Sequence, residues 1–323
     1  KFKYSSKYLL GSDGSNSVVR KLLNISQKDL SYNRNWVVVD IKLNGENKLG
    51  DKVIQICDKK RLATFVPSHL PFRRWEFLVH DNEKKDDFLD NKKIQKLISK
   101  WLKADEYEII RKAVYQFHSV IAEKFQNGNC FLIGDAAHQS PPFMGEGMMS
   151  GYRDVVNLCW KIALTIKLNL KEELLKTYEK ERIPHSRFVV ENSAGIGELM
   201  EAYAEAEDPN KVPKELIKKG YGSFILPDLK EGLFFGGVAD EEMKSGTLYP
   251  QPIQYSNKKI GVRLDRLLGK GFCLISSGEY ISNKENMEFL KNIDCKFLVL
   301  KKEIISKNPF LKSLMKNDKV FLV

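Results

Sequence analysis

The stretch FLIGDAAHQSPPFMGEGMMSG, residues 131–151, constrains the fold of this chain more than any other part of the sequence. A short apolar run ends at Gly134 and Asp135, prolines and glycines follow, and apolar positions from Met148 onward keep helical spacing. This order predicts a buried strand, a stiff loop and a long helix. The first N–H groups of such a helix lack intrahelical partners, and the helix dipole adds partial positive charge there. The loop is therefore suited to an anion or an electron-rich ring oxygen.

Individual residues of this loop suit a particular kind of ligand. Gly145 and Gly147 let a ligand approach the backbone closely, because glycine has no Cβ. Asp135 at the strand tip can accept hydrogen bonds from sugar-like hydroxyl groups, and Pro141 and Pro142 fix the direction of the chain. Together they suit a flat, polar-edged cofactor with a polyol arm. The alternative is a tight strand-to-helix turn in which Asp135 is only a local cap.

The first part of the chain alternates between strand and helix patterns. Residues 8–23 have the pattern of a strand, a turn and a helix. Short strand-like runs separated by Asn, Gly, Asp and Pro occupy residues 36–80 and predict an antiparallel sheet. Residues 83–113 are charged and have a helical pattern. Its apolar positions are Ile94, Leu97, Ile98, Trp101 and Leu102.

The second half predicts long helices followed by a small mixed tail. A helix is expected from about Lys171, with an interruption at Pro184, because proline lacks the N–H that a helix interior requires. Residues 205–253 are rich in Gly and Pro and suggest a connecting region. The tail then mixes strands with helices in an α/β pattern.

The composition excludes several classes of protein. The 323 residues are 42% hydrophobic and 29% charged, which is typical of a soluble globular protein. The net charge is +11, but the lysines alternate with acidic residues, which favours a solvated basic surface over a nucleic-acid partner. No apolar run approaches the roughly 18 residues of a membrane span, and residues 1–20 lack the features of a signal peptide.

The motifs that are missing narrow the chemistry further. The five cysteines form no C-x-x-C pair and no cluster with histidine, so they fit reduced thiols in a cytoplasmic protein and do not support metal binding. The G-x-S-x-G, P-loop and H-E-x-x-H motifs are also absent. The sequence begins at Lys1, and residues 8–10 already have a strand pattern, so we expect it to begin inside a longer protein.

Two motifs resemble those of a known family. GDAAHQSPPFMGEGMMSGYRDVVNLCWKIAL, residues 134–164, closely resembles the second flavin-binding motif of the FAD-dependent aromatic hydroxylases, which are single-component flavoprotein monooxygenases. YLLGSDGSNSVVR, residues 8–20, resembles their G-x-D-G-x-x-S-x-V-R motif. The flanking sequences resemble the subgroup typified by 3-(3-hydroxyphenyl)propionate hydroxylase. The resemblance covers nearly the whole chain.

This resemblance implies a mixed α/β fold. It comprises an FAD-binding three-layer domain without its N-terminal portion, a substrate-binding β-sheet domain and a C-terminal thioredoxin-like domain without C-x-x-C. The expected boundaries are 1–30 and 105–204 for the FAD-binding domain, 31–104 for the sheet, 205–254 for the connecting region and 255–323 for the tail. The tail is assigned a structural or dimer-forming role, so a homodimer is one expectation.

The resemblance also assigns residues to the cofactor. Asp135 would hydrogen-bond the ribityl chain of FAD, Pro142 would lie near the reactive edge of the flavin ring, and the backbone around Gly145 would face its pyrimidine end. The expected FAD-binding residues are Asp13, Gly14, Arg20, Gly134, Asp135, Ala136, Pro142, Gly145, Gly147 and Met148. For Asp13 and Arg20 the alternatives are a turn cap and a surface charge.

Other polar and aromatic residues have two interpretations each. Arg73, Trp75 and His118 are substrate candidates; the alternatives are a strand-edge charge for Arg73, and core or surface positions for the other two. Arg74 can pair with a substrate carboxylate beside Arg73, or be another strand-edge charge. His138 is expected to be structural near the flavin. Asp154 and Asn157 are expected to anchor the helix.

The sequence departs from the family pattern at two places. Glu146 stands between the loop glycines, where the family usually has glutamine; its charge would oppose a reduced flavin anion if it faced the ring, and would be harmless if it faced solvent. The chain also lacks the G-x-G-x-x-G turn that holds the FAD pyrophosphate. AGIGELM, residues 194–200, lacks the third glycine and lies within a helical pattern.

The function that the resemblance implies is hydroxylation of a small phenolic substrate with O2 and NADH, or less favourably NADPH, through a flavin hydroperoxide. No side chain need be a nucleophile, because the flavin carries the chemistry. Two alternatives stay open. One is a non-catalytic fragment that no longer holds FAD, and the other is the same fold acting on polyketide-type fused-ring phenols.

Overall fold

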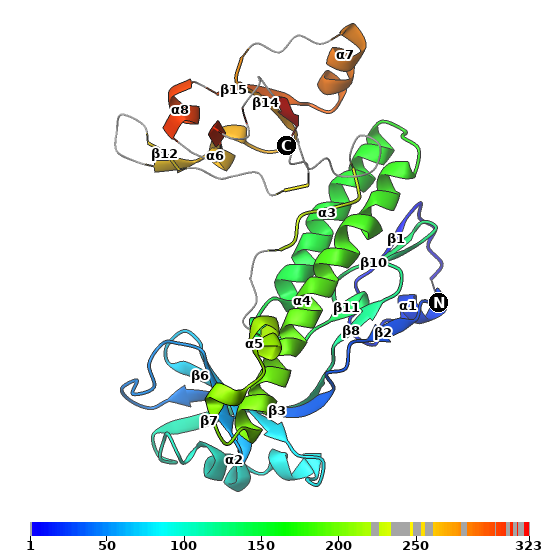
Figure 1. Cartoon of the computed structure of the whole chain (residues 1–323). Coiled ribbons are helices and arrows are strands. Elements are labelled where there is room, and N and C mark those ends of the chain that lie inside the picture. The colour runs from blue at the N-terminus through cyan, green and yellow to red at the C-terminus, as the bar shows by residue number, and fades with distance from the viewer. Residues whose placement is uncertain are drawn as a thin grey trace. The chain divides into compact units, whose positions relative to one another are not determined.

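A computed structural model describes most of the chain (Figure 1). The described residues are 2–220, 226–233, 246–247, 253–255, 261–278, 283–300, 302–307, 311–312, 315 and 320–322. They form two compact units, of which the first comprises Lys1–Val156 and Arg182–Leu226, and the second comprises Asn157–Glu181 and Pro227–Val323. Two long helices contribute residues to both units.

A five-stranded antiparallel sheet dominates the first unit, as the sequence predicts. Its order is β4 (Ile54–Asp58), β5 (Arg61–Pro67), β6 (Phe72–Val79), β3 (Arg34–Leu43) and β7 (Tyr107–Phe117). Successive side chains of a strand point to opposite faces. One face is apolar, and it packs with Ile94 and Ile98 of helix α2 (Asn91–Ile98) into the main core. The core residues on this face include Val37, Val39, Ile41, Phe65, Trp75 and Phe77.

The helical pattern expected over residues 83–113 is only partly correct. A short 3₁₀ helix, η1 (Lys85–Leu89), precedes α2, which ends at Ile98, and residues 107–117 form strand β7. The sequence YEIIRKAVYQF contains β-branched and aromatic residues that favour a strand, and its charged positions Glu108 and Arg111 are exposed at the edge of the sheet. The sheet therefore extends beyond the domain boundary expected at residue 104.

Two smaller sheets bring the sequence motifs together. Strand β1 (Leu9–Gly11) runs parallel to β10 (Cys130–Leu132), which also pairs with β9 (Gln126–Asn127). Helix α1 (Val18–Leu22) follows β1. A second sheet has the order β11 (His138–Gln139), β8 (Val120–Ala122) and β2 (Gln27–Asp29). The 3₁₀ turns η2 (Gly134–Ala136) and η3 (Pro142–Met144) then lead into helix α3 (Gly147–Lys167). The predicted strand, loop and long helix are confirmed.

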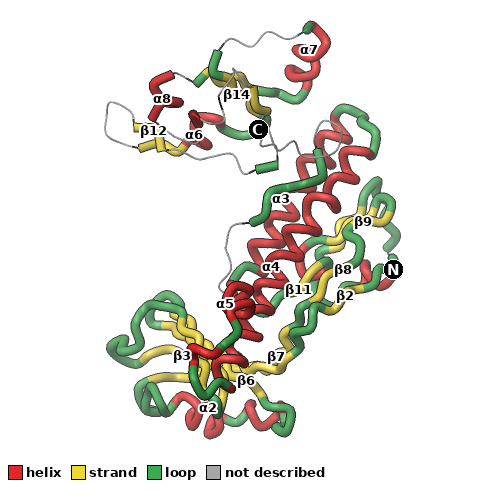
Figure 2. The backbone as a smooth tube through the Cα atoms, in the orientation of Figure 1, coloured by secondary structure: helices red, strands yellow, loops and turns green. Residues whose placement is uncertain are grey.

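The predicted interruption at Pro184 is wrong. Helix α4 (Glu173–Glu205) is continuous through Pro184 and includes residues 194–200. Figure 2 shows α4 as one long helix beside α3. Pro184 removes one hydrogen bond from a helix of 33 residues, and its ring is exposed. Buried side chains on both sides of it, such as Tyr178 and Val190, hold the helix in place. Helix η4 (Pro209–Lys211) and α5 (Lys214–Gly220) follow.

The tail in the second unit has the predicted mixture of strands and helices. Strand β14 (Cys273–Ser276) pairs parallel with β15 (Lys296–Val299) and antiparallel with β16 (Val320–Leu322). Strands β12 (Ile253–Tyr255) and β13 (Gly261–Arg263) form a hairpin-like pair. The helices are α6 (Leu264–Leu268), α7 (Lys284–Asn292) and α8 (Lys302–Lys307). The thioredoxin-like assignment stays a prediction, and part of GTLYPQP lies outside the described residues.

Replacing Pro184 with alanine is expected to stabilise the protein by about 1–2 kcal/mol. Alanine restores the missing N–H and is the best helix former, while the loss of proline's restraint on the unfolded chain offsets part of the gain. Urea unfolding monitored by circular dichroism measures the change, with exposed Lys180→Ala in the same helix as the control. A Pro184→Ala protein that is less stable than the parent would contradict this account of the helix.

Candidate functional site

The tip of strand β10 presents one free carboxylate. Gly134 has a φ of 60°, which turns the chain, and the next residue, Asp135, is exposed. The Asp135 carboxylate makes no hydrogen bond or ion pair with the described part of the chain, so the local-cap alternative is wrong for this residue. A Cβ added to Gly151 of α3 would lie 3.3 Å from the Cα of Gly134, so the strand tip and the helix approach each other closely.

The loop between this tip and α3 is fixed from both sides. The hydroxyl of Ser193 donates to the buried Pro141 carbonyl over 2.6 Å. The Phe143 ring packs edge-on against Tyr32 and Trp36, with ring centroids 5.6 and 5.3 Å apart. Gly145, with a φ of 66°, donates from its N–H to the Pro142 carbonyl over 2.8 Å and closes the turn. The loop is therefore held rigidly before the helix begins.

The start of α3 leaves space for a ligand. Pro142 is exposed, and Met148 is 72% exposed. A Cβ on Gly145 would meet nothing within 4 Å, and one on Gly147 would reach only the Ser140 hydroxyl at 3.7 Å. The first N–H groups of this 21-residue helix lack intrahelical acceptors. These features match a flat ring with electron-rich oxygens.

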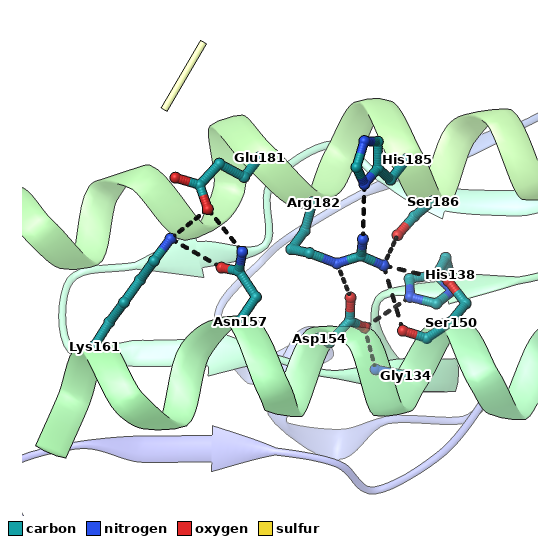
Figure 3. Close-up of polar contacts among 10 residues, drawn as sticks. All are labelled: Gly134, His138, Ser150, Asp154, Asn157, Lys161, Glu181, Arg182, His185 and Ser186. Atoms are coloured by element: carbon teal, nitrogen blue, oxygen red, sulfur yellow. Dashed lines mark hydrogen bonds and ion pairs between the residues drawn. The ribbon is translucent and has the colours of Figure 1, made fainter. Parts of the chain in front are cut away.

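A buried charge network centred on Asp154 anchors α3 to the strand tip (Figure 3). One carboxylate oxygen accepts from the Gly134 N–H over 2.9 Å and lies 2.8 Å from His138 Nε2, and the other accepts from Arg182 Nε over 2.8 Å. Burial alone would raise the pKa of Asp154, but the hydrogen bond from His138 and the Arg182 charge lower it overall. Asp154 and His138 therefore have the structural roles expected of them.

Arg182 extends this network along α4. Its Nη2 group donates to the Ser150 carbonyl over 3.3 Å and lies 3.4 Å from the Ser186 hydroxyl, while Nη1 lies 3.2 Å from Nδ1 of His185 (Figure 3). Asp154 and Arg182 are both buried. Arg182 was not predicted from the sequence, because the charged run that contains it has the pattern of a solvated helix face.

A second buried network lies further along the same two helices, within the second unit. Lys161 is 0% exposed and donates to Glu181 over 2.6 Å and to the Asn157 side chain over 2.9 Å (Figure 3). Asn157 also donates to Glu181 over 2.7 Å, and the other Glu181 oxygen accepts from the Leu233 N–H over 2.9 Å. The anchoring role expected for Asn157 is confirmed. Sequence reasoning missed Lys161 and Glu181.

The first motif reaches the loop through a buried arginine. Arg20 donates to the Ala136 carbonyl over 2.8 Å and to the Ser15 carbonyl over 3.0 Å, and it is only 6% exposed. The alternative of a surface charge at Arg20 is wrong, because the guanidinium is buried and these two carbonyls accept its hydrogen bonds. Arg20 joins the two sequence motifs in space.

Asp13 caps the start of α1. Its carboxylate accepts from the Ser17 hydroxyl over 2.5 Å and from the Val18 and Val19 N–H groups over 2.7 and 3.0 Å. The Ser17 hydrogen bond is the main reason why the pKa of Asp13 is lowered. Gly14, with a φ of 81°, forms the turn before the helix. Asp13 therefore has the turn-capping role that was the alternative for it.

The charge of Glu146 is balanced by Arg153 of α3. Its carboxylate pairs with Arg153 over 2.7 Å, and both side chains are about one-third exposed, at 31% and 33%. The charge that could oppose a reduced flavin anion is therefore balanced locally.

The substrate candidates do not gather at one place. Arg73 is buried and donates to the Ser68 and Phe72 carbonyls over 2.8 Å, whereas Arg74 pairs with Asp40 over 2.6 Å on the opposite face. Trp75 is completely buried in the main core, which is its alternative role. His118 Nδ1 lies 2.8 Å from the Asn33 side chain. A cavity of about 500 Å³ is lined by Asp40, Val66, His69, Phe72, Arg73 and Arg74, among others.

One buried carboxylate was not singled out from the sequence. Glu76 lies in the middle of β6, on the face opposite the main core, and is 4% exposed. Burial raises the pKa of Glu76 to about 7; the Arg74 charge opposes this rise and the Asp40 charge adds to it. The side chain makes no hydrogen bond or ion pair with the residues that the structure describes. The signal in the sequence is a glutamate inside the apolar strand run WEFLV.

Comparisons with known proteins agree with this geometry. Residues 1–193 match the family described as FAD binding domain. A 3-(3-hydroxy-phenyl)propionate/3-hydroxycinnamic acid hydroxylase 2 of Burkholderia vietnamiensis is 29% identical over 292 residues, covering 85% of this chain and 52% of the relative. A probable NADH-specific resorcinol 4-hydroxylase of Rhodococcus jostii is 28% identical over 280 residues, with 85% and 51% covered. The chain spans about half the length of these relatives.

Solved structures show the same fold. Aklavinone-11 hydroxylase in complex with FAD and aklavinone superposes with a TM-score of 0.70 at 22% identity, covering 91% of this chain and 57% of that one. The flavin-dependent monooxygenase PieE in complex with FAD and substrate gives 0.71 at 18% identity, with 92% and 61% covered. The fold and the loop thus define an FAD-binding domain. The chain belongs to the FAD binding domain family, that of the FAD-dependent aromatic hydroxylases.

The described residues contain neither a metal-ligand cluster nor a membrane-spanning helix. No group of three or more His, Cys, Asp and Glu side chains among them could hold a metal ion. Within the same part of the chain, no helix is both long and apolar enough to cross a membrane.

Replacing Asp154 with asparagine is expected to destabilise the protein by about 3–5 kcal/mol, because it leaves the buried Arg182 without its counter-ion. Urea unfolding at neutral pH measures the change, with exposed Asp105→Asn as the control for loss of one carboxylate. Equal stability of the two variants would contradict the anchoring role of Asp154.

Glu76 is expected to make stability fall as pH rises from about 4.5 to about 7. The carboxyl has a higher pKa in the folded protein than in the unfolded chain, so the folded state favours the neutral form and loses that advantage once it ionises. With about 1.4 kcal/mol for each tenfold change in ionisation constant, the loss is about 3 kcal/mol.

The matching experiment compares Glu76→Gln with Glu108→Gln on the exposed edge strand. Thermal and urea unfolding of Glu76→Gln should match the parent near pH 5 and exceed it near pH 8, whereas Glu108→Gln should follow the parent at both. A parent-like pH profile for Glu76→Gln would show that Glu76 ionises normally.

Proposed function

We propose that this chain forms part of an FAD-dependent monooxygenase that hydroxylates a phenolic aromatic substrate with NAD(P)H and O2. The observation that carries the proposal is the rigid loop from Gly134 to Gly147. It carries an exposed carboxylate with no partner among the described residues, and it leads into the start of α3, where a Cβ on Gly145 would meet nothing within 4 Å. The family membership and the names of the relatives support the same class of reaction.

The residues of the loop fit the cofactor that the family implies. The Asp135 carboxylate would accept from ribityl hydroxyl groups, and the N–H groups at Gly147 and Met148 would donate to the polar edge of the flavin ring. Pro142 is exposed, so its ring could lie against the flavin and limit the access of water there. Because proline has no N–H, it would also offer no backbone donor to a water molecule. When bound, FAD would supply the redox chemistry, so that no nucleophilic side chain is needed.

The protein's own electrostatics would favour the reduced cofactor. Negative charge near the first turn of a helix is stabilised by about 0.3–1 kcal/mol, and by up to about 2 kcal/mol when partly buried. The Glu146–Arg153 pair keeps the Glu146 charge from opposing this effect. Arg20 and Asp154 would act on the cofactor indirectly, because they hold the loop in place. Arg20 donates to the Ala136 carbonyl, and Asp154 accepts from the Gly134 N–H.

The substrate would be a small phenol, in keeping with the names of the curated relatives. One relative is named as NADH-specific, which supports NADH over NADPH. A fused-ring phenol is the second candidate, since aklavinone-11 hydroxylase shares the fold. Product analysis after incubation with each class of phenol, FAD, NADH and O2 distinguishes the two.

Asp135→Ala is expected to weaken FAD binding at least tenfold, because a hydrogen bond to a charged acceptor typically contributes about 1.5–3 kcal/mol. A flavin titration followed by absorbance and fluorescence measures this, in this chain and in the longest form of the protein that its gene encodes. Asp105→Ala is the control for an exposed carboxylate. If the longest parent form binds no FAD, the monooxygenase proposal fails; if Asp135→Ala and Asp105→Ala bind equally, the placement of Asp135 is wrong.

A further inference from the structure

The environment of Glu76 is unusual for a carboxylate in the middle of a sheet. Thr64 of β5 and Val38 of β3 lie directly opposite Glu76 on the two neighbouring strands, and Ala113 of β7 continues the same row. Thr64 and Val38 are both buried. Glu76 therefore occupies a row that is otherwise small, apolar or weakly polar.

Several polar side chains on this face bind partners other than Glu76. The Thr64 hydroxyl donates to the Gln55 side chain over 2.6 Å. Arg74, two residues away on the same face, uses Nε and Nη2 on Asp40, over 2.6 and 3.2 Å. Arg111 of β7 also faces Asp40, at 3.7 Å. The acceptor atoms of Glu76 are thus left unused within the described part of the chain.

Packing alone does not account for this residue. Burying an unpaired polar group costs free energy, and a buried carboxylate responds by raising its pKa, as Glu76 does. Valine or threonine would fit the middle of this strand without that cost. A titratable group with a perturbed pKa and no structural partner is a candidate for a functional role.

We propose that Glu76 accepts the hydroxyl proton of a phenolic ligand bound on this face of the sheet. The proposal rests on the proposed function, and it assigns the group that recognises the phenol. In the proton transfer, the O–H bond of the phenol breaks and an O–H bond forms on the Glu76 carboxylate, giving a phenolate and a neutral carboxyl. The step involves no oxidation or reduction, and no further reactant is required.

The surroundings suit such a ligand. A cavity of about 500 Å³ begins one row away from Glu76, where Asp40, Val66 and Arg74 are among the residues that line it. At the other end of this face, Trp36 packs in an aromatic cluster with Phe143, which belongs to the loop from Gly134 to Gly147. A base with a pKa near the working pH is also the most effective proton acceptor.

The binding test compares phenol with anisole, its methyl ether, which has the same ring but no proton to donate. The full chain is titrated with each compound near pH 8, and dissociation constants are taken from NMR shifts of the protein. The parent protein is expected to bind phenol about tenfold more tightly than anisole, as for one hydrogen bond to a charged acceptor.

Three variants make this measurement decisive. Glu76→Val, which suits a strand interior, should bind phenol and anisole equally. Glu76→Gln, which keeps an uncharged acceptor, should show an intermediate preference. Glu108→Gln should retain the preference of the parent. An undiminished preference for phenol in folded Glu76→Val would overturn the proposal, and so would equal binding of the two compounds by the parent.

A kinetic test separates proton transfer from simple hydrogen bonding. In the flavin-loaded longest form, the dependence of kcat on pH should show a limb near pH 7 that Glu76→Gln removes, with KM changed much less than kcat. A limb that persists in Glu76→Gln would overturn the role of Glu76 as a base. If this form hydroxylates no phenol at all, the proposed function fails, while the comparison of phenol with anisole still decides whether Glu76 recognises the hydroxyl.

Discussion

The loop that carries the candidate cofactor residues depends on one buried carboxylate. Asp154 of α3 joins the Gly134 N–H and His138, which both lie at the strand tip, to Arg182 of α4. Because Asp154 is buried, these partners must all be present for its charge to be tolerated. The buried Asp154 network therefore fixes the position of the strand tip and of the exposed Asp135 that follows it.

The parts of the fold that follow from local spacing could be predicted from the sequence. The strand-like runs WVVVDIKL and RRWEFLVH, which turn residues separate, predicted antiparallel strands, and the apolar positions from Met148 onward predicted α3. The failures at β7 and Pro184 have a different origin. Strand β7 is held by its pairing with β3, and α4 is held by buried side chains on both sides of the proline. Those tertiary contacts override local preference, and a single sequence does not display them.

The residues of the candidate site also fall into two groups, those that local sequence features predict and those that they do not. Glycines, prolines and Asp135 were visible because their backbone properties or their place at a strand end are local. Arg20, Lys161 and Arg182 were not recognised as buried, since a charged residue on a helix normally faces solvent. Their acceptors lie 116, 20 and 28 residues away in sequence. Only the folded arrangement shows that these charges have partners.

Four carboxylates of the first unit differ only in burial and partners, and these differences separate structural from functional roles. Asp154 is buried and fully paired, so its charge is committed to holding the loop. Glu146 is half-buried and balanced by Arg153, which leaves the helix N-terminus electropositive. Asp135 is exposed and has no partner among the residues that the structure describes, which suits hydrogen bonds to a polyol. Glu76 is buried and has no hydrogen-bond or ion-pair partner in the described part of the chain, and its raised pKa, about 7, suits proton exchange near neutral pH. We propose that the two carboxylates without a partner among the described residues are the ones that meet ligands, Asp135 on the loop that would hold the cofactor and Glu76 on the sheet.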